Sequence, residues 1–466
     1  MSPDGKRLLY GSYQGRQWQQ LWLTTPEGRS PLPLTFGEFD RRNARWSPDG
    51  QRVLYTSNET GNTTLWIQDV VGGQRQQIVA AKRDYLSRTG TLTLSLRDER
   101  GQPVAGRVML LAGDGRYYGP SDAWLHGDDS FDRAQQKQEN RYFHCQERCS
   151  VELPVGAGTL WVMSGFARRP VQQNLTMSPS GLELAITLQA QLLPEKFGVF
   201  TSADLHVHMN YGGTYRQHLA GLAAQARAED LDVVYNLIVN KEQRIPDISE
   251  FTTDARQIGT TTIYQSQEFH TSYWGHLGLL HLDDHLLLPD FSSYRHTALA
   301  SPYPHNGVIA DLAHAQHALV GYVHPFDTII DPDKEKTLSH TLPVDVALGK
   351  ADYIEIVSFA DHRSTAAVWY HLLNLGYQLA AGAGTDAMTN YASLRGPVGL
   401  NRGVSRDRRS QPGGSQGCTE AGEWLCDECA VARTQGRWRQ PRSDAASAGW
   451  ATPRAMSMQP SVPSCR

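Results

Sequence analysis

The chain has 466 residues, which is enough for about three domains of ordinary size and a large buried core. Its 44 basic and 48 acidic residues leave a formal net charge of −4, so no global positive field exists to hold nucleic acid or an anionic membrane. No apolar run reaches the ~18 residues that span a bilayer, and the first residues lack the apolar stretch of a signal peptide. We therefore expect no nucleic-acid partner and no membrane insertion; the oligomeric state stays open.

The first 82 residues contain an internal repeat. Ser-Pro-Asp-Gly at residues 2–5 recurs at residues 47–50, and Leu-Trp at residues 21–22 recurs at residues 65–66, a period of about 45 residues. Each copy reads as a turn, an alternating strand, a polar turn and a second strand with a buried Trp, which is typical of a β-propeller blade. The repeat resembles that of TolB-type propellers.

Two blades do not close a propeller, which normally has four or more. The chain also begins inside a repeat. We therefore expect residues 1–82 to be an incomplete propeller, and we expect the full-length protein to have residues before Met1, with an export signal among them. This implies a periplasmic or secreted location, although the chain as written lacks a signal peptide.

Residues 87–193 change to short alternating apolar runs separated by Gly-rich turns, which predicts an antiparallel β-sandwich. The predicted strands include residues 91–96, 107–111, 150–154 and 159–163. The phrase LRDERGQPVAGRVMLL resembles a carboxypeptidase-regulatory-type or Ig-like sandwich, a kind of module that usually acts as a spacer. Cys145 and Cys149 either form a hairpin disulfide in an oxidising compartment or remain free thiols, and the sequence leaves both open.

Strands alternate with helical stretches from residue 199 to residue 402. We expect strands at 203–208, 231–239, 261–265, 319–323, 353–357 and 378–383, and helices at 216–229, 307–315 and 366–375. This alternation is typical of a parallel α/β barrel or sheet, whose functional residues lie at the C-terminal ends of the strands. The same segment holds 15 of the 17 histidines, which favours metal binding or proton transfer.

Potential metal ligands stand at the ends of the predicted strands. His206 and His208 alternate along one strand, so both imidazoles point to the same side. The other candidates follow later strands, and the set is His206, His208, Glu268, His276, His324 and Asp386. Nitrogen and carboxylate ligands suit Zn, Mn or Fe rather than a thiolate site. We predict one or two divalent ions.

Five segments in this order, DLHVHMNYGG, QEFHTSYWGHLGLL, GYVHPF, IEIV and LAAGAGTDAM, resemble the PHP superfamily of metal-dependent hydrolases, and within it the CehA/McbA type. The resemblance covers residues 199–402. It implies a distorted (β/α)7 barrel with one to three metals at its mouth, and a metal-activated water that attacks an ester, amide, carbamate or phosphoester bond of a small molecule. All six candidate ligands match by position, with Glu268 as the bridging glutamate.

The chain departs from the superfamily pattern at two positions. Asn236 stands near the place of a usual Asp-His pair, and Met388 replaces the histidine of a usual Asp-x-His. Both changes remove nitrogen ligands, so we expect one or two ions rather than three. A reduced site fits a hydrolase of esters, amides or carbamates. It also fits a non-catalytic or damaged protein, that is, a propeller-linked binding module with a degenerate metal site.

Other polar residues lie beside the predicted ligands. His362, which follows Asp361, is a candidate proton donor to the leaving group. Tyr211 and His270 either touch the substrate or pack as scaffold, and Glu355 is expected to orient a ligating imidazole. The remaining histidines are expected to be surface or hydrogen-bonded scaffold residues: His281, His285, His296, His305, His314 and His317.

The composition breaks after Arg402. Residues 403–466 contain no Ile, Phe, Tyr, Lys, Asn or His, yet hold four of the six cysteines. Cys426 and Cys429 lack a second ligand pair at a spacing that fits a zinc knuckle. Reread one base out of frame, residues 424–432 permit Gly-Phe-Ala-Thr-Asn-Ala-Pro-Leu, which resembles the Phe-Ala-Thr-Asn-Gly-Pro expected after such a barrel. We predict a frameshifted, disordered tail; a natural disordered tail is the alternative.

Overall fold

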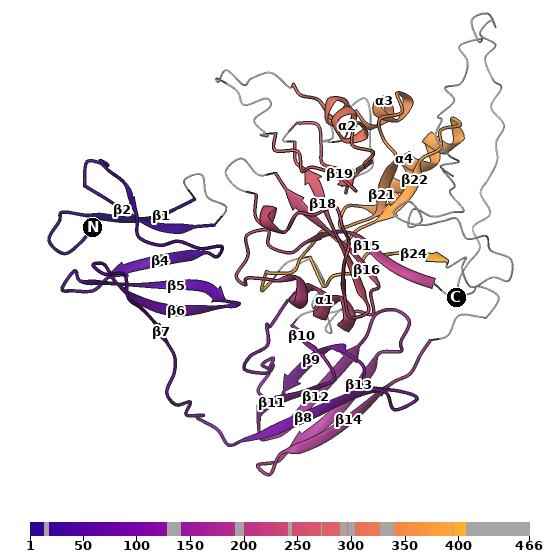
Figure 1. Ribbon diagram of the computed structural model, residues 1–466. Coiled ribbons are helices and arrows are strands. Elements are labelled where there is room, and N and C mark those ends of the chain that lie inside the picture. Colours follow the sequence, from indigo (N-terminus) through magenta and orange to yellow (C-terminus); the bar gives the residue numbers. More distant parts are fainter. Residues whose placement is uncertain are drawn as a thin grey trace, which may run out of the picture. The chain divides into compact units, whose positions relative to one another are not determined.

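The computed structural model shows several β-sheets and few helices (Figure 1). It describes residues 1–13, 18–127, 141–191, 200–240, 245–271, 273–288, 296, 303–326, 339, 341–393 and 395–406. These residues all belong to one compact unit. The predicted tail beyond residue 406, with Cys426 and Cys429, lies outside the described residues.

The N-terminal region forms two separate small sheets, and the strand Arg41–Trp46, which precedes the second Ser-Pro-Asp-Gly turn, belongs to the second sheet. The first has the order β1-β2-β3 and the second the order β4-β5-β6-β7, with all neighbouring strands antiparallel; a propeller blade has the same number of strands as the second sheet. Their bounds are β1 Leu8–Ser12, β2 Gln20–Thr24, β3 Leu32–Pro33, β4 Arg41–Trp46, β5 Arg52–Thr60, β6 Asn62–Asp69 and β7 Arg75–Ile78. Trp22 is buried as expected, whereas Trp66 is only half-buried.

Each repeat begins with the same hydrogen-bonded turn. Ser2 Oγ donates to Asp4 Oδ1 at 2.6 Å and accepts from the Arg7 amide at 2.9 Å. Ser47 makes the equivalent bonds to Asp49 at 2.5 Å and from the Arg52 amide at 2.9 Å. The Gly that closes each turn has a φ near +70°, a conformation that costs a residue with a Cβ, which explains why Ser-Pro-Asp-Gly recurs intact.

Residues 89–188 form a sandwich of two sheets with the orders β10-β9-β12-β13 and β11-β8-β14. The strands are β8 Thr89–Asp98, β9 Gly106–Ala112, β10 Phe143–Cys145, β11 Arg148–Pro154, β12 Gly156–Met163, β13 Val171–Met177 and β14 Leu182–Leu188. Leu92, Leu94 and Leu96 alternate along β8 and are fully buried in the core between the sheets. The prediction of a purely antiparallel sandwich was wrong at one edge, because β14 pairs with β8 in parallel.

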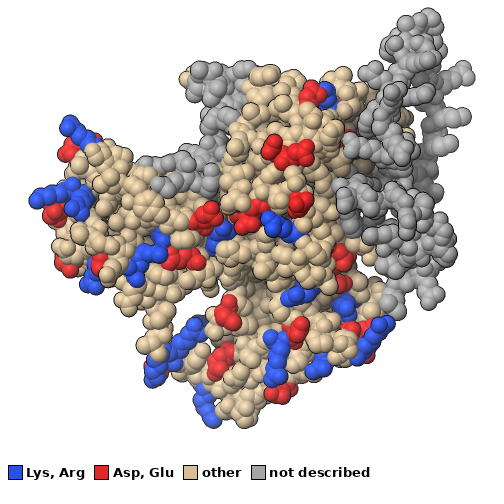
Figure 2. All heavy atoms as spheres, viewed as in Figure 1, with Lys and Arg blue, Asp and Glu red and all other residues tan. Residues whose placement is uncertain are grey.

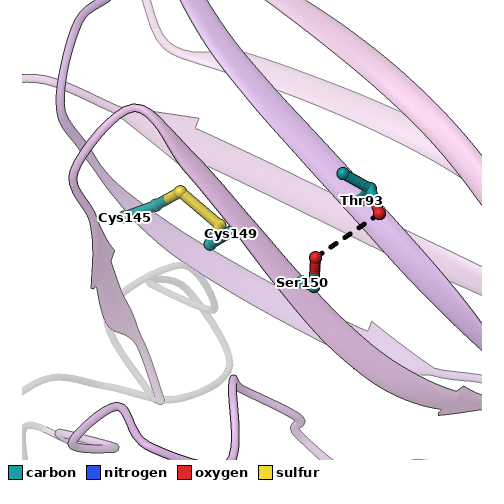
Figure 3. The surroundings of a disulfide bond; sticks show 4 residues. All are labelled: Thr93, Cys145, Cys149 and Ser150. Carbon is teal, nitrogen blue, oxygen red and sulfur yellow. Dashed lines mark hydrogen bonds between the residues drawn. A yellow bond between two sulfur atoms is a disulfide. The ribbon is translucent and has the colours of Figure 1, made fainter.

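Cys145 and Cys149 are joined by a disulfide in this structure (Figure 3). It closes the short turn that connects β10 to β11, which belong to different sheets. Beside it, β11 pairs with β8, and the hydroxyls of Thr93 and Ser150 lie 3.4 Å apart. The structure therefore contains the bridged form of the two alternatives that the sequence left open.

The third region is a curled mixed sheet with the order β22-β21-β20-β19-β18-β16-β15-β23. Its strands are β15 Phe200–His208, β16 Val233–Val239, β17 Arg256–Ile258, β18 Thr261–Phe269, β19 Leu277–Leu280, β20 Leu319–Tyr322, β21 Tyr353–Val357, β22 Ala380–Ala383, β23 Ala387–Met388 and β24 Gly403–Arg406. The helices of this region are α1 Leu219–Ala228, α2 Asn306–His314, α3 Leu342–Ala347, α4 His362–Asn374 and the 3-10 helix Ile248–Glu250. Figure 1 shows β15 and β16 side by side at its centre.

The sheet curls because one short segment, which contains β22 and β23, pairs with strands at both ends of the strand order. β22 pairs with β21, and β23, which begins four residues after β22 ends, pairs with β15 at the opposite end. The expectation of a parallel sheet was wrong at one strand. β19 runs antiparallel to both of its neighbours, β18 and β20, while α1, α2 and α4 lie at the three expected helices. The apolar faces of α2 and α4, with Ile309, Ala313, Trp369 and Leu372, complete the largest core.

The expectation that structure ends at Arg402 was also wrong. β24 (Gly403–Arg406) pairs antiparallel with β15 from Ala203 to Phe200. Edge pairing uses backbone N–H and C=O groups, so it needs no apolar pattern in the added strand. The unusual composition of residues 403–466 therefore does not prevent the first four of them from extending the sheet.

The described part of the chain contains no helix long and apolar enough to cross a membrane. On the face drawn in Figure 2, basic and acidic side chains are interspersed.

Replacing His285 with Gln is expected to make stability less dependent on pH. Burial lowers the pKa of His285 from 6.5 to about 4, although its Nε2 lies 3.0 Å from the Ile238 carbonyl. Between pH 4 and pH 6.5 the unfolded chain binds more protons at His285 than the folded chain does. The contribution of the neutral His285 to the free energy of unfolding is therefore full above pH 6.5 and falls as the pH drops towards 4. From pH 7.5 to 5, wild type should lose about 2 kcal/mol more than His285→Gln in urea unfolding. Equal losses would contradict this.

Candidate metal centre

Five strands carry polar side chains to one end of the curled sheet. His206 and His208 lie at the end of β15, Glu268 near the end of β18, His276 just before β19, and His324 two residues after β20. Asp386 immediately precedes β23. Alternate residues of a strand share a face, which is why His206 and His208 meet here. The structure brings all six sequence-predicted ligands together.

The two histidines of β15 are held by their Nδ1 atoms. His206 Nδ1 lies 3.0 Å from Glu355 Oε1, and His208 Nδ1 lies 2.7 Å from the Leu237 carbonyl. Both partners are acceptors, so each Nδ1 carries a hydrogen, and in the neutral imidazoles each Nε2 is left with its lone pair. The two Nε2 atoms face each other at 3.1 Å. Two facing lone pairs repel unless a positive charge lies between them.

Glu268 lies between two groups of histidines. Its Oε2 is 3.1 Å from His208 Nε2, whereas its Oε1 is 2.9 Å from His276 Nδ1 and 3.0 Å from His324 Nε2. The possible ligand atoms form two groups, His206-His208-Glu268-Asp386 and Glu268-His276-His324, each with all atoms within 4.8 Å of one another. Glu268 belongs to both groups. This buried cluster could hold a metal ion.

Asp386 closes the first group. Its Oδ1 lies 2.9 Å from His208 Nε2 and 3.5 Å from His206 Nε2. This oxygen is buried and has no hydrogen-bond partner among the described residues, and both neighbouring nitrogens are acceptors when the imidazoles are neutral. Its Oδ2 pairs with the guanidinium of Arg395. A cation would stabilise a buried carboxylate oxygen that lies beside two acceptor nitrogens.

The distances in this first group fit a tetrahedral ion. Ligand bonds of ~2.0 Å place tetrahedral ligands about 3.3 Å from each other. The pairs that join His206 or His208 to each other, to Glu268 and to Asp386 span 2.9 to 3.5 Å. The residues present therefore fit a small divalent cation.

The pKa values of the cluster show that it attracts positive charge. Burial alone would lower the pKa of His206, but the carboxylates of Glu355 and Glu268 outweigh it and raise the pKa to about 10. Burial would raise the pKa of Glu268, but His270, His206 and His276 hold it well below its usual range. Burial and the nearby His270 lower the pKa of His276 to about 3, so a proton is disfavoured there. The carboxylates around His206 favour a cation, either a proton or a metal ion.

The two departures from the superfamily pattern lie beside the cluster. Asn236 accepts from the Met209 amide at 2.8 Å and donates to Gln265 Oε1 at 2.7 Å, so its side chain ties strands together. Met388 is buried in β23, paired with His208 of β15. Neither supplies a nitrogen ligand.

The other candidate residues differ in their positions. Tyr211 lies over the cluster, with its ring 5.0 Å from that of His208. His270 Nε2 lies 2.9 Å from Glu268 Oε2, and its ring stacks on His276 at 3.8 Å, so it belongs to the cluster itself. His362 is exposed at the start of α4, outside both ligand groups. Its role as a proton donor stays a prediction.

Two supporting residues, Glu355 and Asp204, fix the geometry of the site. Glu355, expected from the sequence to orient an imidazole, contacts His206 and also accepts from the His324 amide at 3.0 Å. Sequence reasoning missed Asp204 and Arg395. Asp204 is fully buried and accepts from the amides of three residues that surround the cluster: His206 (3.1 Å), Thr385 (2.9 Å) and Gly399 (2.7 Å). A buried Asp two residues before a His-x-His was the available signal.

Replacing Glu355 with Gln is expected to weaken metal binding by about 10- to 100-fold. The neutral amide attracts the N–H of the His206 ring less strongly than a carboxylate does. Its NH2 group would also face the backbone N–H of His324, and two donors repel each other. Titration against a chelating dye measures this. The exposed Glu183 of the sandwich provides a matched control, Glu183→Gln. Equal affinities in wild type and Glu355→Gln would remove Glu355 from this role.

No family model matches the chain. A segment of 66 residues is 32% identical to the Tol-Pal system protein TolB of Thioalkalivibrio sulfidiphilus, covering 14% of this chain and 15% of that protein. A segment of 83 residues is 29% identical to the uncharacterized peptidase YuxL of Bacillus subtilis, covering 16% and 13%. The chain thus matches about one seventh of the length of these relatives, and its sequence similarity is TolB-like.

Solved structures with some likeness include PsfC of Pseudomonas syringae, which covers 48% of this chain and 88% of that chain at 15% identity and a TM-score of 0.29. The lesion-specific endonuclease PfuEndoQ of Pyrococcus furiosus covers 45% and 54%, also at 15% identity and a TM-score of 0.29. A putative TolB of Agrobacterium tumefaciens covers 39% and 52% at 16% identity and a TM-score of 0.16. TM-scores of this size do not establish a common fold.

Proposed function

We propose that the chain is a metal-dependent hydrolase of the CehA/McbA type in the PHP superfamily, with its curled sheet as a distorted (β/α)7 barrel. The observation that carries the proposal is Glu268, whose two oxygens face two separate sets of imidazoles. A carboxylate in this position is suited to bridging two ions. The proposed ligands are His206, His208, Glu268, His276, His324 and Asp386.

A divalent cation in this site would lower the pKa of a bound water and polarise the bond to be cleaved. The chain's own residues do the remaining work. Glu355 and the Leu237 carbonyl fix the imidazoles of β15, so that both Nε2 atoms stay aimed at one point. Tyr211 covers His208, where it would contact a substrate. The proposed substrates are small molecules with an ester, amide, carbamate or phosphoester bond.

The test is a hydrolysis panel on protein loaded with Zn, Mn or Fe. We expect one or two equivalents of metal, and turnover of at least one p-nitrophenyl ester, carbamate or phosphoester that stops when a chelator removes the metal. Metal binding without turnover of any class would favour the alternative, a binding module. Turnover that survives complete removal of metal would refute the proposal.

We also propose a periplasmic or secreted location. The disulfide between Cys145 and Cys149 supports it, because such bonds persist in oxidising compartments. The TolB-like similarity points the same way. Thiol alkylation after rapid acid quenching of cells tests the proposal: both cysteines should be protected in wild type, and labelling of both as free thiols would contradict it.

A further inference from the structure

Arg395 lies at the exposed side of the ligand cluster. Its Nη1 contacts Asp386 Oδ2, its guanidinium carbon lies 3.9 Å from the centre of the Phe359 ring, and its side chain is 26% exposed. The Phe359 ring in turn lies 4.7 Å from that of His324 and is 43% exposed. Arg395 and Phe359 therefore form a cation–π pair that reaches from one candidate ligand to another at the solvent side of the site.

A structural counter-ion is the simpler role for Arg395, but it fits the proposed metal centre poorly. Asp386 already offers Oδ1 to the first ligand group, so a divalent cation there would neutralise the carboxylate. The guanidinium at Oδ2 would then share this single negative charge with a divalent cation, which leaves positive charge in excess around Asp386. Two divalent ions together with Arg395 also outweigh the charges of Glu268, Asp386 and Glu355, so a loaded centre attracts anions.

The guanidinium of Arg395 is suited to binding an anion. It has five N–H donors in a fixed fork, so it donates to Asp386 and to a second anion at once. The neighbouring surface is apolar, since Val357 and Phe359 at the end of β21 are each 43% exposed. This surface is therefore complementary to a ligand that has an anionic group beside an apolar group.

We propose that Arg395 is a specificity-determining residue that binds an anionic group of the substrate, a phosphate or a carboxylate next to the scissile bond, while Phe359 contacts the apolar portion. This rests on the proposed hydrolase function and narrows its substrate class. Three probes that share a p-nitrophenyl leaving group separate the sources of the anion. p-Nitrophenyl phosphate places it on the reacting atom, p-nitrophenyl succinate carries it on a side arm, and p-nitrophenyl acetate lacks it.

The variants are Arg395→Gln and Arg395→Lys, with Arg363→Gln on the exposed first turn of α4 as a control for net charge. In Arg395→Gln we expect kcat/KM to fall by about 10- to 100-fold on the anionic probes that wild type cleaves, and less than about threefold on the acetate. Arg395→Lys should recover part of the loss, because it keeps the charge and loses the fork. Equal losses on anionic and neutral probes would overturn the proposal.

A second readout does not depend on turnover. Calorimetric titration of inorganic phosphate into the metal-loaded protein should give an affinity that falls about tenfold or more in Arg395→Gln and is unchanged in Arg363→Gln. Metal content should be kept in both variants. Unchanged phosphate affinity in Arg395→Gln would refute the proposal even if no probe is hydrolysed, whereas failure of the metal-loaded wild type to cleave any probe counts against the hydrolase function alone.

Discussion

Replacing His206 with Ala is expected to remove most of the bound metal and to lower hydrolysis by at least about 100-fold. The change deletes an Nε2 that lies 3.1 to 3.5 Å from three other candidate ligand atoms. It also leaves Glu355, which is fully buried, without the imidazole that it contacts at 3.0 Å. Elemental analysis by mass spectrometry measures the metal, and wild type should hold one or two equivalents.

Loss of metal in His206→Ala has to be separated from loss of fold. The conservative variant His206→Gln fills more of the space and should fold while it still fails to bind metal. His371→Ala, an exposed histidine in the last turn of α4, is the matched control and should keep wild-type metal and activity. Full metal content in a folded His206→Gln protein would show that His206 is not a ligand.

Replacing Asp204 with Ala is expected to destabilise the metal-free protein by about 4 kcal/mol or more. Three buried backbone amides, those of His206, Thr385 and Gly399, would lose their acceptor together. Asp204→Asn keeps one oxygen to accept from the amides of His206 and Thr385, but its NH2 group would face the amide of Gly399. We therefore expect this variant to lose about half as much stability as Asp204→Ala. Urea unfolding without metal measures both, since metal binding would add its own stabilisation.

The control for Asp204 is Asp254→Ala, an exposed aspartate whose removal should change the free energy of unfolding by less than about 0.5 kcal/mol. If Asp204→Ala stays within 1 kcal/mol of wild type, Asp204 does not hold the Asp386 segment against β15. A clear loss of stability with retained metal affinity would make the role of Asp204 structural alone.

The sequence predicted those parts of the site that depend on local periodicity. His206 and His208 alternate on a strand, so their convergence follows from a repeat of two residues. Glu268, His324 and Asp386 follow predicted strands, and strand ends meet at one edge of a sheet. Ser-Pro-Asp-Gly likewise predicted two equivalent turns, because its hydrogen bonds lie within a few residues.

The parts that depend on distant contacts were not predictable in the same way. Nothing local shows that Asp204 accepts from Gly399, or that Arg395 reaches Asp386. The short run Leu277–Leu280 gives no sign of its direction, so the antiparallel β19 was missed. β24 was not predicted because pairing with β15 through backbone groups requires no particular pattern of side chains.

The most direct test of the metal centre is anomalous diffraction at the zinc edge from crystals grown with Zn²⁺. We predict a peak about 2.0–2.2 Å from the Nε2 atoms of His206 and His208, with Asp386 Oδ1 and Glu268 Oε2 as the other ligands, and a second peak beside Glu268 Oε1 if two ions bind. Zinc elsewhere in the crystal with no peak beside Glu268 would contradict the account.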